Sequence, residues 1–66
     1  MSKCGELLKA LSERKISGNT RIQCSEPMRS MTDQQKEIRA GQILSILNRS
    51  KDEQSFISAM KNMNLI

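Results

Sequence analysis

Apolar residues recur at helical spacing near the start of the chain. One face of this segment carries, at positions i, i+3, i+4 and i+7, the residues Cys4, Leu7, Leu8 and Leu11. Ser2 stands where an N-cap is expected, and Gly18 can supply the left-handed residue that ends a helix. The pattern therefore predicts a helix over residues 3–16.

A second helix is predicted over residues 33–48, and it has two faces of different character. Thr32 and Gln35 form a capping-box pattern at its start. Its main apolar stripe consists of Ala40, Ile43, Leu44 and Leu47. Because successive helical residues turn by about 100°, Ile38 points about 160° away from Ala40. We expect this other face to bind a partner through Met31, Ile38, Gln42 and Ile46.

The clearest start signal in the chain precedes a third predicted helix, over residues 51–63. Ser50 and Glu53 form a second capping box, with Ser50 as the expected N-cap. The apolar stripe of this helix consists of Phe56, Ile57, Met60 and Met63. Because only a short turn separates it from the 33–48 helix, the two are expected to form a tight antiparallel hairpin.

The segment 17–31 lacks a clear helical pattern and is predicted to be a loop. Residues 20–25 alternate polar and apolar side chains, as a half-buried strand would. A lone strand is not stable, so this alternative requires pairing with a second copy in a dimer. Pro27 either breaks the chain or opens the first turn of a new helix. The expected fold is all-α: one domain over residues 1–66, a small three-helix bundle with a longer connection between its first two helices.

Positive charge is concentrated in that connection. The chain has a net charge of +4, and residues 14–29 hold four basic residues against the single acid Glu26. A basic stretch of this kind attracts nucleic-acid phosphates or an acidic protein surface. The cations expected to make such contacts are Arg14, Lys15, Arg21, Arg29 and Arg49. The alternative is that they form a solvated loop that keeps the protein soluble.

The residue types present argue against catalysis and against a bound metal or cofactor. The chain has no histidine, and Cys4 and Cys24 do not have the spacing of a zinc or iron–sulfur site. Cys4 lies on the apolar stripe, which is more typical of a core cysteine than of a nucleophile. Three scattered glycines cannot form a phosphate-binding loop. We therefore expect no enzymatic activity, no metal, no cofactor and no small-molecule substrate.

The location expected from the sequence is the cytoplasm. The N-terminal residues lack the apolar segment of a signal peptide. The longest apolar cluster, residues 43–47, is far too short to cross a bilayer, so no membrane association is expected. In a reducing compartment the two cysteines stay as thiols, and a disulfide between them is the less favoured alternative.

Together these features predict a regulatory or adaptor module that binds another protein, or a second copy of itself, through an apolar helix face flanked by basic residues. Four internal methionines fit either core packing or an adaptable binding groove. The alternative function is a dimeric DNA- or RNA-binding regulator that places residues 14–29 on phosphates. The acidic start of the 51–63 helix makes it a poor recognition helix, and Phe56 is the only aromatic side chain that could stack on a base.

Overall fold

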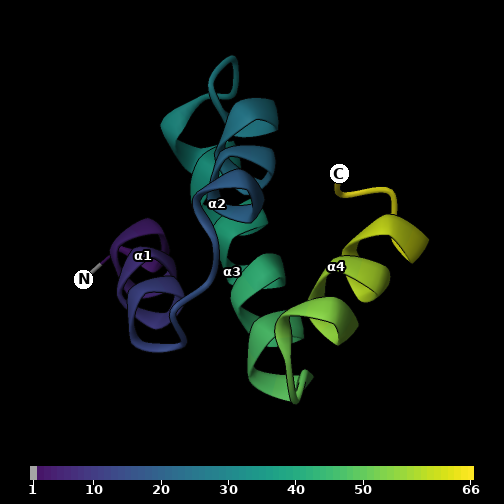
Figure 1. Ribbon diagram of the computed structural model, residues 1–66. Helices are drawn as coiled ribbons and strands as arrows, with labels where there is room; N and C mark the ends of the chain where they lie inside the picture. Colours follow the sequence, from purple (N-terminus) through teal and green to yellow (C-terminus); the bar gives the residue numbers. More distant parts are fainter. Residues whose placement is uncertain (1) are drawn as a thin grey trace.

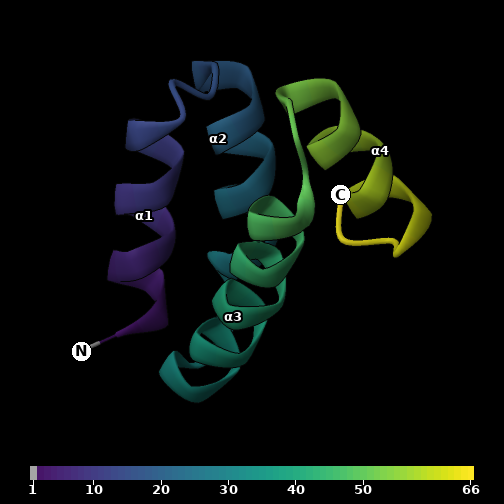
Figure 2. The same ribbon diagram turned by 90° about the horizontal axis from the view of Figure 1, so that it is seen from below.

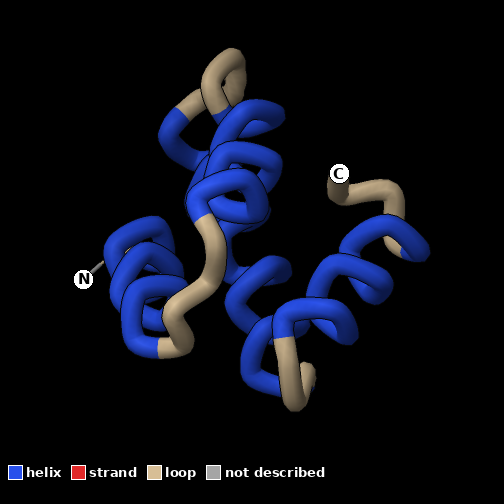
Figure 3. The backbone as a smooth tube through the Cα atoms, in the orientation of Figure 1, coloured by secondary structure: helices blue, strands red, loops and turns tan. Residues whose placement is uncertain are grey.

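The computed structural model describes residues 2–66 and is all-helical over that range, which confirms the predicted fold class (Figures 1 and 3). The number of helices differs from the prediction, since the described residues form four α-helices and one short 3-10 helix. In chain order these are α1 (Lys3–Glu13), α2 (Gly18–Ser25), η1 (Glu26–Met28), α3 (Asp33–Arg49) and α4 (Glu53–Asn62).

The predicted loop over residues 17–31 is wrong, because α2 and η1 occupy most of it. Ser17 is the N-cap of α2, and its Oγ accepts a hydrogen bond from the backbone N–H of Thr20 at 3.4 Å. Gly18 is the first residue of α2 and not the stop of the preceding helix. The polar–apolar alternation of residues 20–25 is not a strand; Thr20 and Cys24, four residues apart, form the buried stripe of a short helix.

The first helix ends at Glu13, earlier than predicted, in a Schellman motif. Lys15 adopts the left-handed conformation with φ of 56°, and its N–H donates to the carbonyl of Ser12. The N–H of Ile16 then donates to the carbonyl of Leu11, and the two side chains are both buried. The hydrophobic contact that usually accompanies this motif thus places Ile16 in the core, although it lies beyond the helix.

The same motif ends α4 and docks the C-terminal residues. Asn64 has φ of 58°, and the N–H of Leu65 donates to the carbonyl of Met60 at 2.9 Å. Leu65 is buried, so the end of the chain is held against the core.

The start of α3 agrees with the sequence prediction. Thr32 Oγ1 accepts from the N–H of Gln35 at 3.2 Å, and Gln35 Oε1 accepts from the N–H of Thr32 at 3.3 Å. The predicted capping box is therefore confirmed, because both reciprocal hydrogen bonds are present.

The predicted start of the last helix is wrong by two residues. Asp52 is the N-cap of α4, and its Oδ1 accepts from the N–H of Ser55 at 2.8 Å. Ser50 is the C-cap of α3, where its hydroxyl donates to the carbonyl of Ile46 at 2.8 Å. Its hydroxyl therefore adds a second donor to a last-turn carbonyl of the helix before it, and the next carboxylate in the chain caps the helix that follows.

The core lies where α3 meets the other helices. α3 runs between α1 and α4 in both ribbon views (Figures 1 and 2). α4 folds back from the end of α3, but the two helices diverge as an open V and not as a tight hairpin (Figure 1). Cys24 of α2 reaches into this region, where its Sγ lies 3.7 Å from Met60 Sδ. The buried apolar side chains are Leu7, Leu11, Ile16, Cys24, Ala40, Ile43, Ile46, Leu47, Phe56, Met60 and Leu65.

Two residues of the predicted apolar stripes are largely exposed. Leu8 is 64% exposed and Met63 is 57% exposed. α1 packs against α3 along one line, which buries Leu7 and Leu11 and leaves Leu8 at the edge of the contact. The two predicted stripes were therefore too wide.

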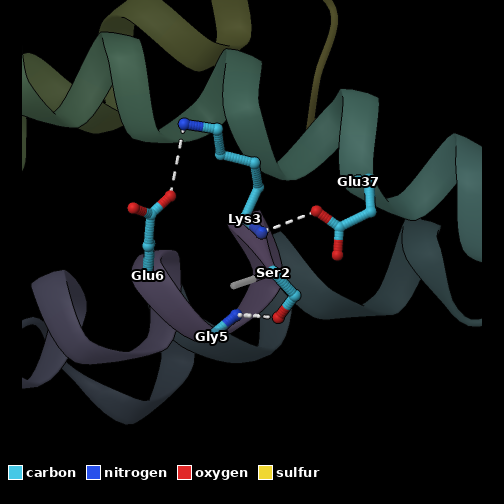
Figure 4. A network of polar contacts seen from close by, with 5 residues as sticks. All are labelled: Ser2, Lys3, Gly5, Glu6 and Glu37. Atoms are coloured by element: carbon cyan, nitrogen blue, oxygen red, sulfur yellow. Dashed lines mark hydrogen bonds and ion pairs between the residues drawn. The ribbon is translucent and has the colours of Figure 1, made fainter.

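The first turn of α1 is fixed to α3 by polar contacts (Figure 4). The carboxylate of Glu37 accepts from the backbone N–H of Lys3 at 2.6 Å, and Ser2 Oγ accepts from the N–H of Gly5 at 3.1 Å. Both bonds satisfy donors that a helix N-terminus leaves free. Ser2 is therefore the N-cap of α1, as predicted, and Glu37 serves the same end of the helix from another element.

Replacing Lys15 with glycine is expected to stabilise the fold. A side chain in the left-handed region costs about 1 kcal/mol, and part of the gain is offset because glycine loses more entropy on folding. We expect denaturant unfolding to show a gain of up to about 1 kcal/mol for Lys15→Gly. Lys15→Ala is the control, because it removes the same charge but keeps the Cβ. An equal gain in both variants would assign the effect to charge and not to the backbone.

Candidate functional site

A polar junction joins the N-terminal ends of α2 and α4. Glu53 Oε1 accepts from the backbone N–H of Ser17 at 3.0 Å. Its Oε2 accepts from the hydroxyls of Ser17 at 2.9 Å and Thr20 at 3.0 Å. These bonds hold the pKa of Glu53 below its ordinary value of 4.5, since the Ser17 N–H and the two hydroxyls favour the charged carboxylate. The junction fixes where α4 begins, and so positions the surface between α3 and α4.

The stability of the protein should depend on this junction in a pH-dependent way. Because folding lowers the pKa of Glu53, its stabilising effect is complete above pH 4.5 and is lost as the pH falls through the lower folded value. We expect Glu53→Gln to melt at a lower temperature than the wild type at pH 7. At pH 3 the difference in melting temperature between the two proteins should be smaller. Glu13→Gln, at the exposed end of α1, is the control. A constant gap at both pH values would contradict the assignment.

Two cations of the predicted basic stretch bind other groups of the same chain. Arg21 Nε donates to the carbonyl of Ile16 at 3.0 Å, and its Nη2 lies 3.5 Å from the carbonyl of Leu11. Arg29 pairs with Glu26 at 3.7 Å, one helical turn away. Residues 14–29 therefore do not form one free basic loop, and Arg21 supports the end of α1.

Other cations gather around the turn between α3 and α4. Arg14 Nη1 donates to the carbonyl of Ser50 at 2.9 Å, which brings the end of α1 to this turn. Together with the acids Asp52 and Glu53, Arg14 and Lys51 line one small cavity of about 200 Å³. Arg49 lies at the end of α3, and all three side chains are exposed. Arg49 and Lys51 are neighbours of this turn in the sequence, but no local signal reports that the end of α1 folds against it and brings Arg14.

The predicted partner-binding face of α3 is only partly assembled. Met31, Ile38 and Gln42 line a shallow groove of about 270 Å³ with Gln35 and Arg39, which we call the outer groove. Ile38 is 60% exposed there. Ile46 is not part of it, because α4 folds back over its side of α3 and leaves it 8% exposed. Ile38 therefore faces solvent, whereas Ile46 faces α4, and the two residues do not belong to one surface.

Ile46 instead lies in a second and larger groove, which we call the α3–α4 groove. This groove has a volume of about 490 Å³. It is lined by Ile46, Arg49, Ser50, Lys51, Ser55, Ala59 and Met63. Its apolar side chains come from both helices, and its cations come from the end of α3 and the turn that follows. None of the described residues that line it is acidic.

The two cysteines lie in the core or against it. Burial raises the pKa of the Cys24 thiol to about 11, so this cysteine is protonated and unreactive at neutral pH. Cys4 is a free thiol that packs against the core. Within residues 2–66, no group of three acidic or cysteine side chains could hold a metal ion.

No helix in the described part of the chain is long and apolar enough to cross a membrane. Comparisons with protein-family models, with curated proteins and with solved structures find no match for this chain. A function can therefore be argued only from the surfaces described above.

Proposed function

We propose that this chain is a non-enzymatic regulatory or adaptor module that binds another protein through the α3–α4 groove. The observation that carries the proposal is the composition of this groove: an apolar floor from two helices, bordered by the cations Arg49 and Lys51. Grooves of this size between helices are common sites for a partner's helix or extended segment. The mechanism is occupancy, in which apolar contacts give affinity and exposed cations favour one orientation.

The α3–α4 groove is a better candidate than the outer groove on α3. The outer groove presents Ile38 among polar and charged side chains, with Met31 at its edge. The α3–α4 groove offers Ile46, Ala59 and Met63 together. Met63 is more than half exposed, and a flexible thioether side chain adapts well to a partner's surface. Of the internal methionines, Met60 serves the core and Met63 serves this groove.

The remaining expectations fit the same proposal. The high pKa of Cys24 and the buried position of its thiol support a structural cysteine. Free Cys4 and Cys24 suit a reducing, cytoplasmic setting. The alternative, a nucleic-acid-binding regulator, is supported by the exposed Arg14, Arg49 and Lys51 but weakened by the internal bonds of Arg21.

A selection from random peptides of about 12 residues displayed on phage tests the proposal. We expect selected peptides to lose binding to Met63→Glu, which places a charge in the groove at an exposed position. The matched control is Leu8→Glu, which replaces an equally exposed apolar residue on α1 and should bind them normally. Circular dichroism establishes that both variants stay helical. Peptides that bind both variants equally, or that fail on both, would contradict a role for the groove.

A further inference from the structure

From the charges around the α3–α4 groove we infer its occupant: an acidic amphipathic protein segment whose apolar side chains cover Ile46, Ala59 and Met63 and whose carboxylates meet Arg49 and Lys51. This inference rests on the proposed function, since it specifies the chemistry of the partner at that site. It adds a requirement that the apolar floor alone does not impose, namely a negative charge at one end of the bound segment.

The apolar part of the site selects for a segment with one hydrophobic side. Ile46 is 8% exposed, Ala59 is half-buried and Met63 projects at the border. A volume of about 490 Å³ lies in the range of sites that hold a ligand. An amphipathic helix or an extended segment fills such a groove with side chains spaced along one of its faces.

The polar end of the site selects for negative charge. Arg49 and Lys51 are exposed beside the groove, and Arg14 donates a hydrogen bond to the carbonyl of Ser50, which lies between them in the sequence. The nearby carboxylates of Asp52 and Glu53 are charged. Hydrogen bonds from Ser55 and, to a smaller extent, the charge of Lys51 lower the pKa of Asp52. Neither acidic residue lines the groove, however, and each accepts hydrogen bonds within the fold. Asp52 caps α4, and Glu53 binds Ser17 and Thr20.

The end of α3 would otherwise repel an anion, because free carbonyls give a helix C-terminus partial negative charge. Here two of those carbonyls, of Ile46 and Leu47, have donors. The carbonyl of Ile46 accepts from the N–H and the hydroxyl of Ser50, and the carbonyl of Ser50 accepts from Arg14. Arg49 and Lys51 are the charged side chains that line this end of the groove itself.

Two other occupants fit less well. Nucleic acid would gain little from an apolar floor, and Phe56, the only aromatic residue, is fully buried and cannot stack on a base. A second copy of this chain carries a net charge of +4, so the two copies would repel each other. An acidic segment of another protein matches both the floor and the charge.

The experiment compares phage selections on the wild type and on the double variant Arg49→Glu/Lys51→Glu. On the wild type, we expect peptides in which aspartate or glutamate flanks apolar residues. On the double variant, we expect lysine or arginine in their place. A synthetic wild-type-selected peptide should bind the double variant at least about tenfold more weakly, with affinity that falls as salt rises. Lys9→Glu/Lys61→Glu changes the net charge equally at exposed sites elsewhere and should still select acidic peptides.

The outcomes separate this inference from the proposed function. Peptides without acidic enrichment that still lose binding to Met63→Glu would overturn the inference and leave the groove as a protein-binding site. Loss of acidic preference in Lys9→Glu/Lys61→Glu would also overturn it, because net charge alone would then explain the selection. Peptides that ignore Met63→Glu would overturn the proposed function itself. Binding of random-sequence duplex DNA that disappears in Arg49→Glu/Lys51→Glu, without any groove-dependent peptide, would replace the protein partner with nucleic acid.

Discussion

Replacing Phe56 with alanine should leave the domain largely unfolded at room temperature. Phe56 is fully buried and is the only aromatic side chain of the chain. Truncating a buried phenylalanine to alanine costs about 3–5 kcal/mol, through lost burial and the cavity left behind. A domain of this size has only about 3–10 kcal/mol of stability in total. The expected result is loss of most of the helical circular dichroism signal, or a very large drop in melting temperature.

A volume-conserving change at an equally buried position serves as the control. It shows whether the protein is sensitive to the loss of side-chain volume or to any substitution in the core. Met60 is also fully buried, and Met60→Leu should cost less than about 1.5 kcal/mol. Thermal unfolding followed by circular dichroism checks both variants. If Phe56→Ala melted within a few degrees of Met60→Leu, the Phe56 side chain would not make the large contribution to core packing that is expected here.

Ile46→Asp should unfold the protein, whereas Ile38→Asp should leave it helical. Ile46 is 8% exposed, so aspartate there loses an apolar contact and places an unpaired carboxyl group against the core. The cost amounts to at least several kcal/mol. Ile38 is 60% exposed in the outer groove, where a polar substitution changes stability by about 0.5 kcal/mol or less. Circular dichroism on the two variants measures the contrast directly.

Sedimentation of Ile38→Asp adds information about the outer groove. If the wild type associates and the variant is a folded monomer, the outer groove is a contact between copies of the chain. If both behave alike, the outer groove does not contribute to self-association. An unfolded Ile38→Asp protein would contradict the rotation of α3 described here, because that position would then have to face the core.

The sequence by itself determined the helical class and the features that depend on near neighbours. Ser2 and the pair Thr32 and Gln35 mark helix starts correctly, because a cap is a bond between residues a few positions apart. Apolar periodicity also places correctly the centre of each main stripe: Leu7, Leu11, Ala40, Ile43, Leu47, Phe56 and Met60. These residues face inward in almost any packing of amphipathic helices, because each helix buries its most apolar side.

Features that depend on distant residues, and local features for which the sequence offers competing solutions, could not be predicted in this way. α2 has little local helical signal, and its two buried residues contact side chains of another helix. Thr20 donates a hydrogen bond to Glu53, and Cys24 contacts Met60. The stop of α1 at Lys15 lacks a glycine, and burial of Ile16 against Leu11 accompanies the left-handed turn. Asp52, and not Ser50, caps α4, because the hydroxyl of Ser50 already binds α3.

The candidate site was decided almost entirely by tertiary structure. Periodicity assigned Ile38 and Ile46 to one face, but α4 folds back over Ile46 and leaves Ile38 in solvent. The same return of the chain creates the α3–α4 groove, and the bond from Arg14 to Ser50 brings a third cation from the end of α1. Sequence spacing reports which residues share a side of one helix. Which side is covered, and which charges meet beside the opening, depends on where the other helices pack.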